Sequence, residues 1–261
     1  PTKNLMKFNE FNSLIDLYFE QSQKQNPQHI FLEWLNATNR KKFSWSETTS
    51  SIYKLAKILK NYVKDGDRVL LVSENRPEWL IADLAIMLAN GITVPAYTTY
   101  TENDYKYLIE DCEPTVIILS NNIMHKKLEK TIKEKNFIKK IITFDIVVGA
   151  DYEKKYLDFT SIIKNNLLEE DKVKKTNLKR TSPACIIYTS GTGGDPKGVV
   201  LSHGGILNNL EGAYEIVKPL IAKKPVFLTW LPLSHSYEHT VQFVQIALGA
   251  KVFYAEKIEK L

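Results

Sequence analysis

The residues from Tyr188 to Gly198, YTSGTGGDPKG, combine the groups that bind a polyphosphate. Four glycines in this stretch allow positive φ angles and let several backbone amides point toward one place. Three hydroxyl side chains and the ammonium of Lys197 add further donors. Convergent amides, hydroxyls and a cation favour a phosphate-binding loop. The residues alone also allow an ordinary glycine-rich hairpin turn.

Two better-known phosphate motifs do not fit this loop. A P-loop requires Gly before its Lys and Ser or Thr after it, but Pro196 precedes Lys197 and Gly198 follows it. A dinucleotide fingerprint requires a glycine where Pro196 stands. Apolar runs at 184–188 and 199–201 have the character of strands. The loop is therefore predicted to join two strands, whereas both other motifs open into a helix.

A second stretch with chemical potential runs from His235 to His239, HSYEH. Its H-x-x-E-H form places two imidazoles one helical turn apart, as in inverted zinc peptidases. Few acidic residues follow that could supply a third ligand, so zinc is disfavoured and no metal ligand is assigned. A structural role near a helix N-terminus is the other alternative. The remaining histidines are predicted to be surface or cap residues: His29, His125 and His203.

Alternating helices and strands must position these groups. Apolar periodicity predicts helices over residues 11–24, 46–63, 77–90, 101–112, 122–135, 203–217 and 234–248. Strands are predicted at 30–35, 41–45, 68–73, 92–97, 116–119, 138–144, 184–188, 199–201, 226–231 and 251–254. This order favours an α/β fold with mostly parallel sheets flanked by helices.

Local capping signals set the predicted helix ends. Ser46 and Ser202 are predicted N-caps, and Thr101 with Asp104 forms a capping arrangement. Pro77 suits an early helical position, while Gly91 and Gly249 are predicted to close their helices. Two α/β subdomains are predicted, at 1–180 and 181–261, the second carrying the phosphate loop. Residues 168–182 have the composition of a connecting segment.

Composition indicates a globular protein in a reducing compartment. The chain has 261 residues, of which 44% are hydrophobic, enough for a sizeable core. Its net charge of +5 comes from a Lys-rich region between residues 121 and 180. That region predicts a solvated face or a peripheral membrane contact. The sequence shows no basic motif interleaved with aromatic residues, so nucleic-acid binding is not predicted. Two cysteines without CxxC spacing fit reduced thiols, with Cys185 in the core. A cytoplasmic location is expected, with a membrane-peripheral one as the alternative, and the oligomeric state stays open.

The loop resembles the phosphate-loop signature of adenylate-forming enzymes, Thr-Ser-Gly-Thr-Thr/Ser-Gly-x-Pro-Lys-Gly-Val. Residues 189–199 match it except at Gly193, where Thr or Ser is usual. The segments GDRV at 66–69, ENRPEW at 74–79 and GITVP at 91–95 resemble long-chain fatty acyl-CoA synthetases. The resemblance implies an incomplete adenylate-forming N-terminal domain. It assigns the nucleotide phosphates to Thr189, Ser190, Gly191, Thr192, Gly193, Gly194 and Lys197.

The segment LPLSH at 231–235 resembles a further family motif, Leu-Pro-Leu-x-His. By this match His235 lies near the reacting carboxylate, with Tyr237 and Glu238 nearby. The implied chemistry uses ATP, Mg²⁺ and coenzyme A to convert a carboxylic acid, with a long-chain fatty acid favoured, to an acyl-adenylate and then a thioester. Lys197 and His235 are the residues implied in catalysis.

Other residues of the implied reaction are expected outside this sequence. The resemblance places a magnesium-binding Glu, a ribose-binding Asp and a catalytic Lys after Leu261. The 261 residues alone are therefore expected to bind nucleotide weakly and to make no acyl-CoA. Two alternatives remain: adenylation of an amino or aryl acid, and a fold kept for binding only.

Overall fold

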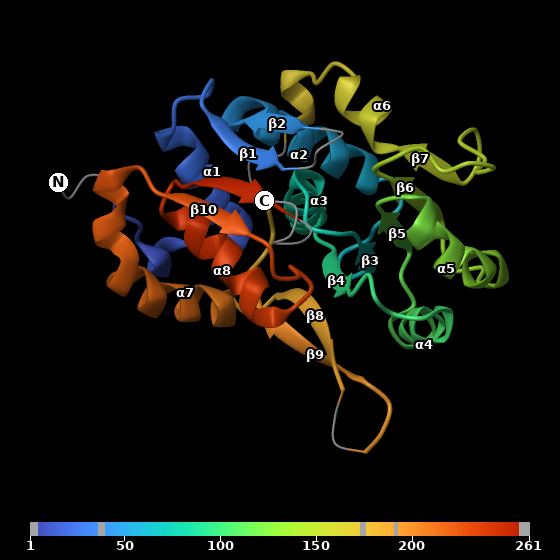
Figure 1. Ribbon diagram of the computed structural model, residues 1–261. Helices are drawn as coiled ribbons and strands as arrows, with labels where there is room; N and C mark the ends of the chain where they lie inside the picture. The colour runs from blue at the N-terminus through green and yellow to red at the C-terminus, as the bar shows by residue number, and fades with distance from the viewer. Residues whose placement is uncertain (1–4, 36–39, 173–175, 191–192, 256–261) are drawn as a thin grey trace.

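The computed structural model describes residues 5–35, 40–172, 176–190 and 193–255. Within them, strands form a seven-stranded sheet in the order β7-β6-β5-β3-β4-β8-β9 and a four-stranded sheet in the order β10-β11-β1-β2 (Figure 1). The strands are β1 Ile30–Trp34, β2 Lys41–Ser44, β3 Arg68–Val72, β4 Ile92–Ala96, β5 Val116–Leu119, β6 Lys140–Thr143, β7 Tyr156–Asp158, β8 Pro183–Thr189, β9 Lys197–Ser202, β10 Val226–Thr229 and β11 Lys251–Tyr254.

Helices cover both faces of the large sheet. The α-helices are α1 Leu14–Lys24, α2 Trp45–Leu59, α3 Pro77–Leu88, α4 Glu102–Cys112, α5 Asn122–Glu134, α6 Phe159–Lys164, α7 His203–Val217 and α8 Ser236–Ala247. Alternate residues of β3 enter two different cores, because successive side chains of a strand point to opposite faces. Leu70 and Val72 pack with α4 and α5, whereas Val69 and Leu71 pack with α2, α3 and α6.

Helix α3 lies at the centre of the molecule. All of its residues are buried, and it contacts β3 and β4 of the large sheet as well as β1 and β2 of the small one. Its sequence, PEWLIADLAIML, is apolar around most of its circumference, as a helix enclosed on all sides requires. Pro77 occupies the first helical turn, as predicted.

Both sheets are mostly parallel, which confirms the predicted fold class. Antiparallel pairing occurs between β1 and β2, the predicted hairpin, and between β8 and β9. β1 also pairs in parallel with β11, with Leu32 opposite Val252. Each sheet therefore contains strands from both sides of residue 180. The predicted boundary at 180 does not separate the sheets, and the division into two subdomains stays a prediction.

Three predicted helix starts are wrong by two or three residues. The first helix begins at Leu14, because Ser13 accepts a hydrogen bond from the Asp16 amide at 3.3 Å. Helix α2 is capped by Ser44 and not by Ser46. The Ser44 hydroxyl accepts from the Glu47 amide at 3.0 Å, and the Glu47 carboxylate accepts from the Ser44 amide at 3.1 Å. The last helix begins at Ser236, with His235 as its N-cap.

The end of α3 also differs from the prediction. Asn90, with a φ of 62°, takes the left-handed conformation that was assigned to Gly91. Gly91 is needed for space, since a Cβ there would lie 3.1 Å from both Ile86 Cγ2 and Val63 Cγ1. The Thr101–Asp104 capping box, the Ser202 cap and the positive φ of Gly249 are confirmed.

Candidate functional site

The predicted phosphate loop joins two strands of a hairpin. β8 and β9 pair with Thr189 opposite Lys197, which confirms the strand–loop–strand prediction. The hairpin projects from the body of the molecule (Figure 1). Gly191 and Thr192 lie outside the described residues. The other predicted loop residues are all exposed: Thr189, Ser190, Gly193, Gly194 and Lys197.

Two glycines of the hairpin are required by its backbone. Gly193 has a φ of 96°, a conformation that residues with a side chain rarely adopt. This conformation explains why glycine suits the position where the resemblance expects Thr or Ser. A Cβ on Gly198 would lie 2.8 Å from Ile186 Cγ2 and 3.2 Å from Tyr188 Cζ, so this site has no room for a side chain.

Helix α4 anchors the base of the hairpin. The Tyr188 hydroxyl donates to Asp111 Oδ2 at 2.6 Å, and the Tyr107 hydroxyl donates to the Pro196 carbonyl at 2.7 Å. Burial, together with the bond to Asp111, raises the pKa of Tyr188 well above its ordinary value, so this hydroxyl keeps its proton. Lys197 follows the anchored Pro196 and has no ion-pair partner among the described residues. Its ammonium is therefore available to an anionic ligand.

The predicted substrate residues lie together at the start of α8. His235 caps the helix, and its Nδ1 accepts a hydrogen bond from the Tyr237 amide at 3.3 Å. His235 and Tyr237 are exposed, whereas Glu238 is half-buried. Burial raises the pKa of Glu238. No hydrogen bond or ion pair joins these three residues to Lys197 in the described part of the chain.

His239 has a different environment from His235. It is 1% exposed, its Nε2 bonds Asp83 Oδ2 at 2.6 Å, and its Nδ1 lies 3.7 Å from Cys185 Sγ. Burial alone would lower the pKa of His239, but the Asp83 carboxylate outweighs it and raises the pKa to about 10. Both ring nitrogens of His239 therefore face other side chains of the protein, whereas His235 is exposed. The described ranges also hold no cluster of three potential metal ligands.

Two histidines assigned to the surface or to caps are buried instead. His203 is fully buried and its Nδ1 accepts from the Leu14 amide at 3.1 Å. Burial lowers the pKa of His203 to about 4. His125 is 6% exposed, with its Nε2 2.6 Å from the Tyr156 hydroxyl. These partners lie far away along the chain, so sequence spacing cannot reveal them. His29 is exposed, as predicted.

A cavity of about 100 Å³ lies where strands of the two sheets end. Its lining comes from segments that follow β3, β4 and β10: Ser73, Glu74, Asn75, Tyr97, Thr98, Thr99, Trp230, Pro232, Leu233 and Ser234. Carboxyl ends of parallel strands are where open α/β sheets bind ligands. No motif assigned the lining residues 73–75 and 97–99 to a site. The position of these residues at the carboxyl ends of two predicted strands, 68–73 and 92–97, was the available signal.

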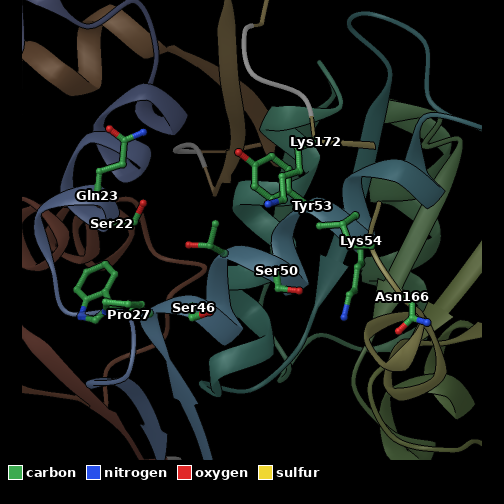
Figure 2. A pocket seen from close by; sticks show the side chains of 12 residues that line it. Ser22, Gln23, Pro27, Ser46, Ser50, Tyr53, Lys54, Asn166 and Lys172 are labelled. Atoms are coloured by element: carbon green, nitrogen blue, oxygen red, sulfur yellow. The ribbon is translucent and has the colours of Figure 1, made fainter. Parts of the chain in front are cut away.

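A separate pocket of about 460 Å³ lies between α1, α2 and the segment around Asn166 (Figure 2). None of the predicted site residues lines it. Its two lysines are engaged, since Lys54 Nζ donates to the Ile163 carbonyl at 2.7 Å and Lys172 Nζ lies 2.6 Å from Glu169 Oε1. The phosphate loop and the α8 segment therefore remain the candidate site. Separately, the described helices include none with the length and apolar character needed to cross a membrane.

A family model and related sequences match most of this chain. Residues 19–261 match the family described as AMP-binding enzyme. The chain is 28% identical to long chain acyl-CoA synthetase 3 of Arabidopsis thaliana over 247 residues, which covers 90% of this chain and 37% of that protein. It is 29% identical to long-chain-fatty-acid–CoA ligase 5 of Rattus norvegicus over 209 residues, covering 74% of this chain and 30% of that protein. It thus spans about a third of the length of these relatives.

Solved structures share the fold. A putative long-chain-fatty-acid CoA ligase from Rhodopseudomonas palustris aligns with a TM-score of 0.78 at 20% identity, covering 95% of this chain and 59% of that one. ATP-bound MatB from the same organism aligns with a TM-score of 0.74 at 21% identity, covering 95% of this chain and 46% of that one. At these identities the likeness concerns the fold alone.

Proposed function

Because the chain belongs to the AMP-binding enzyme family, we propose that it contributes to the ATP-dependent activation of a carboxylic acid and its transfer to coenzyme A. The observation that carries this proposal is the hairpin loop. Its described hydroxyls and glycines are exposed, its base is anchored to α4, and Lys197 has no ion-pair partner among the described residues. Such a loop suits the phosphates of ATP.

In the proposed reaction, a carboxylate oxygen forms a bond to the α-phosphorus of ATP and pyrophosphate leaves with the electrons of the broken P–O bond. A second step transfers the acyl group to the thiol of coenzyme A and releases AMP. Both reactants of the first step are anions, so the site must offset their repulsion and hold them in line. The hydroxyls of Thr189 and Ser190, loop amides and Lys197 would hold the β- and γ-phosphates and stabilise the leaving pyrophosphate.

Mg²⁺ would neutralise part of the phosphate charge when it is bound with the nucleotide. The described residues provide hydroxyls at Thr189 and Ser190 beside the phosphates but no cluster of three potential ligand side chains. Phosphate oxygens and water usually supply most ligands of Mg²⁺ in nucleotide sites, and the magnesium-binding Glu that the resemblance implies is expected after Leu261.

His235 is suited to orient the acid. In the neutral imidazole, Nδ1 accepts from the Tyr237 amide and the proton therefore resides on Nε2. The Nε2–H group can then donate to one oxygen of a substrate carboxylate and leave the other oxygen free to attack phosphorus. This role does not require His235 to carry a charge.

A fatty acid is the favoured substrate class. Trp230, Leu231 and Tyr237 are 42%, 40% and 67% exposed and lie within seven residues of one another around His235. Apolar side chains beside a carboxylate-binding group suit an acid with a hydrocarbon chain. The compared relatives from Arabidopsis and rat bear long-chain acyl-CoA synthetase and ligase names, which supports the same class.

An acyl-hydroxamate assay on the full-length protein tests this proposal. With a panel of fatty, aryl and amino acids, we expect ATP-dependent hydroxamate formation that is fastest with long-chain fatty acids. Activity confined to amino or aryl acids would retain adenylation but reject the fatty acid. No hydroxamate with any acid would favour a protein that keeps the fold for binding only.

A further inference from the structure

Asn75 joins the ends of two strands that belong to different sheets. It follows β3, and its Nδ2 donates to the Leu231 carbonyl at 2.7 Å while its Oδ1 accepts from the Leu233 amide at 3.0 Å. Leu231 and Leu233 follow β10 in the other sheet. Asn75 is 6% exposed, so both bonds are largely shielded from water. A primary amide offers this adjacent donor and acceptor, which a carboxylate or an aliphatic side chain cannot.

The loop that carries Asn75 is itself held in place. The Glu74 carboxylate accepts from the Ser120 hydroxyl at 2.7 Å and from Arg76 Nη1 at 3.1 Å. Arg76 is fully buried, its Nη2 donates to Asp145 Oδ1 at 2.9 Å, and its guanidinium lies 4.3 Å from the centre of the Trp34 ring. Asn75 is therefore flanked on both sides by fixed residues.

The segment held by Asn75 leads directly to His235. The His235 amide donates to the Pro232 carbonyl at 3.1 Å, and the His235 carbonyl accepts from the His239 amide at 3.0 Å. Pro232 lies between the two residues that Asn75 binds. A shift of Pro232 is therefore transmitted through this turn to the imidazole of His235.

We infer that Asn75 is a positioning residue that fixes residues 231–235, and with them His235, for the substrate carboxylate. This inference rests on the proposed function. Asn75 acts through the backbone of Leu231 and Leu233 and needs no contact with the acid. Its loss is expected to affect the use of the acid more than the use of ATP.

Two variants of the full-length protein separate the bonds. Asn75→Leu removes both, whereas Asn75→Asp keeps the acceptor for Leu233 and replaces the donor to Leu231 with an anion. We expect kcat/KM for the acid to fall roughly 10- to 100-fold in both, the scale for a displaced catalytic geometry, with the KM for ATP unchanged. Asn75→Asp should recover at low pH, because a protonated carboxyl again donates to the Leu231 carbonyl, whereas Asn75→Leu should not.

Asn122→Asp is the matched control. Asn122, the first residue of α5, also accepts a backbone amide hydrogen bond at its Oδ1, from Val148 at 2.9 Å, and neither residue lines the cavity. Its kinetics should match the wild type at every pH. The inference would be overturned if Asn75→Leu kept the wild-type kcat/KM for the carboxylic acid substrate. It would also be overturned if the kcat/KM of Asn75→Asp did not recover at low pH. If Asn75→Leu does not fold, the pH profile of Asn75→Asp decides.

Hydrogen exchange provides a readout independent of activity. The Leu233 amide should exchange roughly 10-fold faster in Asn75→Leu than in the wild type, as expected for one lost hydrogen bond. Exchange in α5 should not change. If the wild-type protein activates no carboxylic acid, the proposed function fails, but hydrogen exchange still tests the role of Asn75. Faster exchange of the Leu233 amide in Asn75→Leu supports the positioning role, and unchanged exchange overturns it.

Discussion

At the scale of a single residue, Lys197 combines a fixed backbone with an available charge. The carbonyl of the preceding residue, Pro196, accepts a hydrogen bond from Tyr107, and Lys197 itself pairs with Thr189. Its ammonium has no ion-pair partner in the described residues. A preorganised cation of this kind stabilises charge that develops on a leaving pyrophosphate.

We expect Lys197→Ala to slow acyl-adenylate formation by about 10²-fold, the scale for one preorganised electrostatic donor. The measurement is ATP–pyrophosphate exchange by the full-length protein at saturating acid. Lys126→Ala is a suitable control, because Lys126 is exposed on α5 and away from the hairpin. Equal exchange rates in both variants would remove Lys197 from the proposed mechanism.

At the scale of an element, α8 combines exposed and buried polar groups one turn apart. His235 lies exposed at its N-terminus, while His239 bonds Asp83 of α3 inside the core. Cys185 of β8, the strand that leads into the phosphate loop, lies against the same imidazole. The buried pair therefore fixes α8 between the central helix and the strand of the phosphate hairpin.

The Asp83–His239 pair should make stability depend on pH. The pKa of His239 is about 10 in the folded protein and about 6.5 in an unfolded chain. Its contribution is fully present below pH 6.5, and it is lost as pH rises through 10. We expect the free energy of unfolding, measured in urea, to fall over this window by at most about 1.4 kcal/mol per pH unit from this group.

Asp83→Asn should remove this part of the pH dependence and destabilise the protein by about 3–5 kcal/mol, because it leaves a buried group without its charged partner. Asp65→Asn is the control, since Asp65 is exposed in a turn. An alkaline slope that is the same in both variants would contradict the assigned ion pair. His203 should give the opposite pH dependence. Its pKa is about 4 in the folded protein, below the ordinary value of 6.5, so the free energy of unfolding should decrease as the pH falls from 6.5 toward 4.

At the scale of the whole molecule, the two sheets meet around α3. Arg76 at its N-cap bonds Glu78 and Asp145 and lies over Trp34 of the small sheet. Lys41 of β2 also reaches Glu78, with 2.9 Å between Nζ and Oε2. This charged cluster and α3 hold the carboxyl ends of both sheets in one place, where the cavity and Asn75 lie.

The 261 residues by themselves are expected to bind ATP weakly and to make no acyl-CoA. They span about a third of the length of the compared relatives, and their described residues offer hydroxyls, amides and a Lys cation for the phosphates. ATP–pyrophosphate exchange, measured beside the full-length protein, tests this expectation. Detectable exchange by the 261 residues alone would refute it.

The sequence alone determined the features that depend on neighbouring residues. The strand–loop–strand hairpin, the capping box at Thr101 and the mostly apolar α3 follow from turn chemistry, cap chemistry and periodicity within a few residues. The phosphate-loop motif belongs to the same class, because its groups are contiguous. The start of α2 was predicted wrongly because two serines could cap it, and only Ser44 has Glu47 at the reciprocal position.

Only the tertiary structure decided which distant residues meet. The partners of His203, His239 and Asn75 lie between 54 and 189 positions away along the chain. Sequence patterns therefore placed two buried histidines at the surface or in caps and gave Asn75 no role beyond the family resemblance of residues 74–79. Both His203 and His239 are buried, and burial favours the neutral form of each. Their charge states differ because, of the two, only His239 has a carboxylate within hydrogen-bond distance.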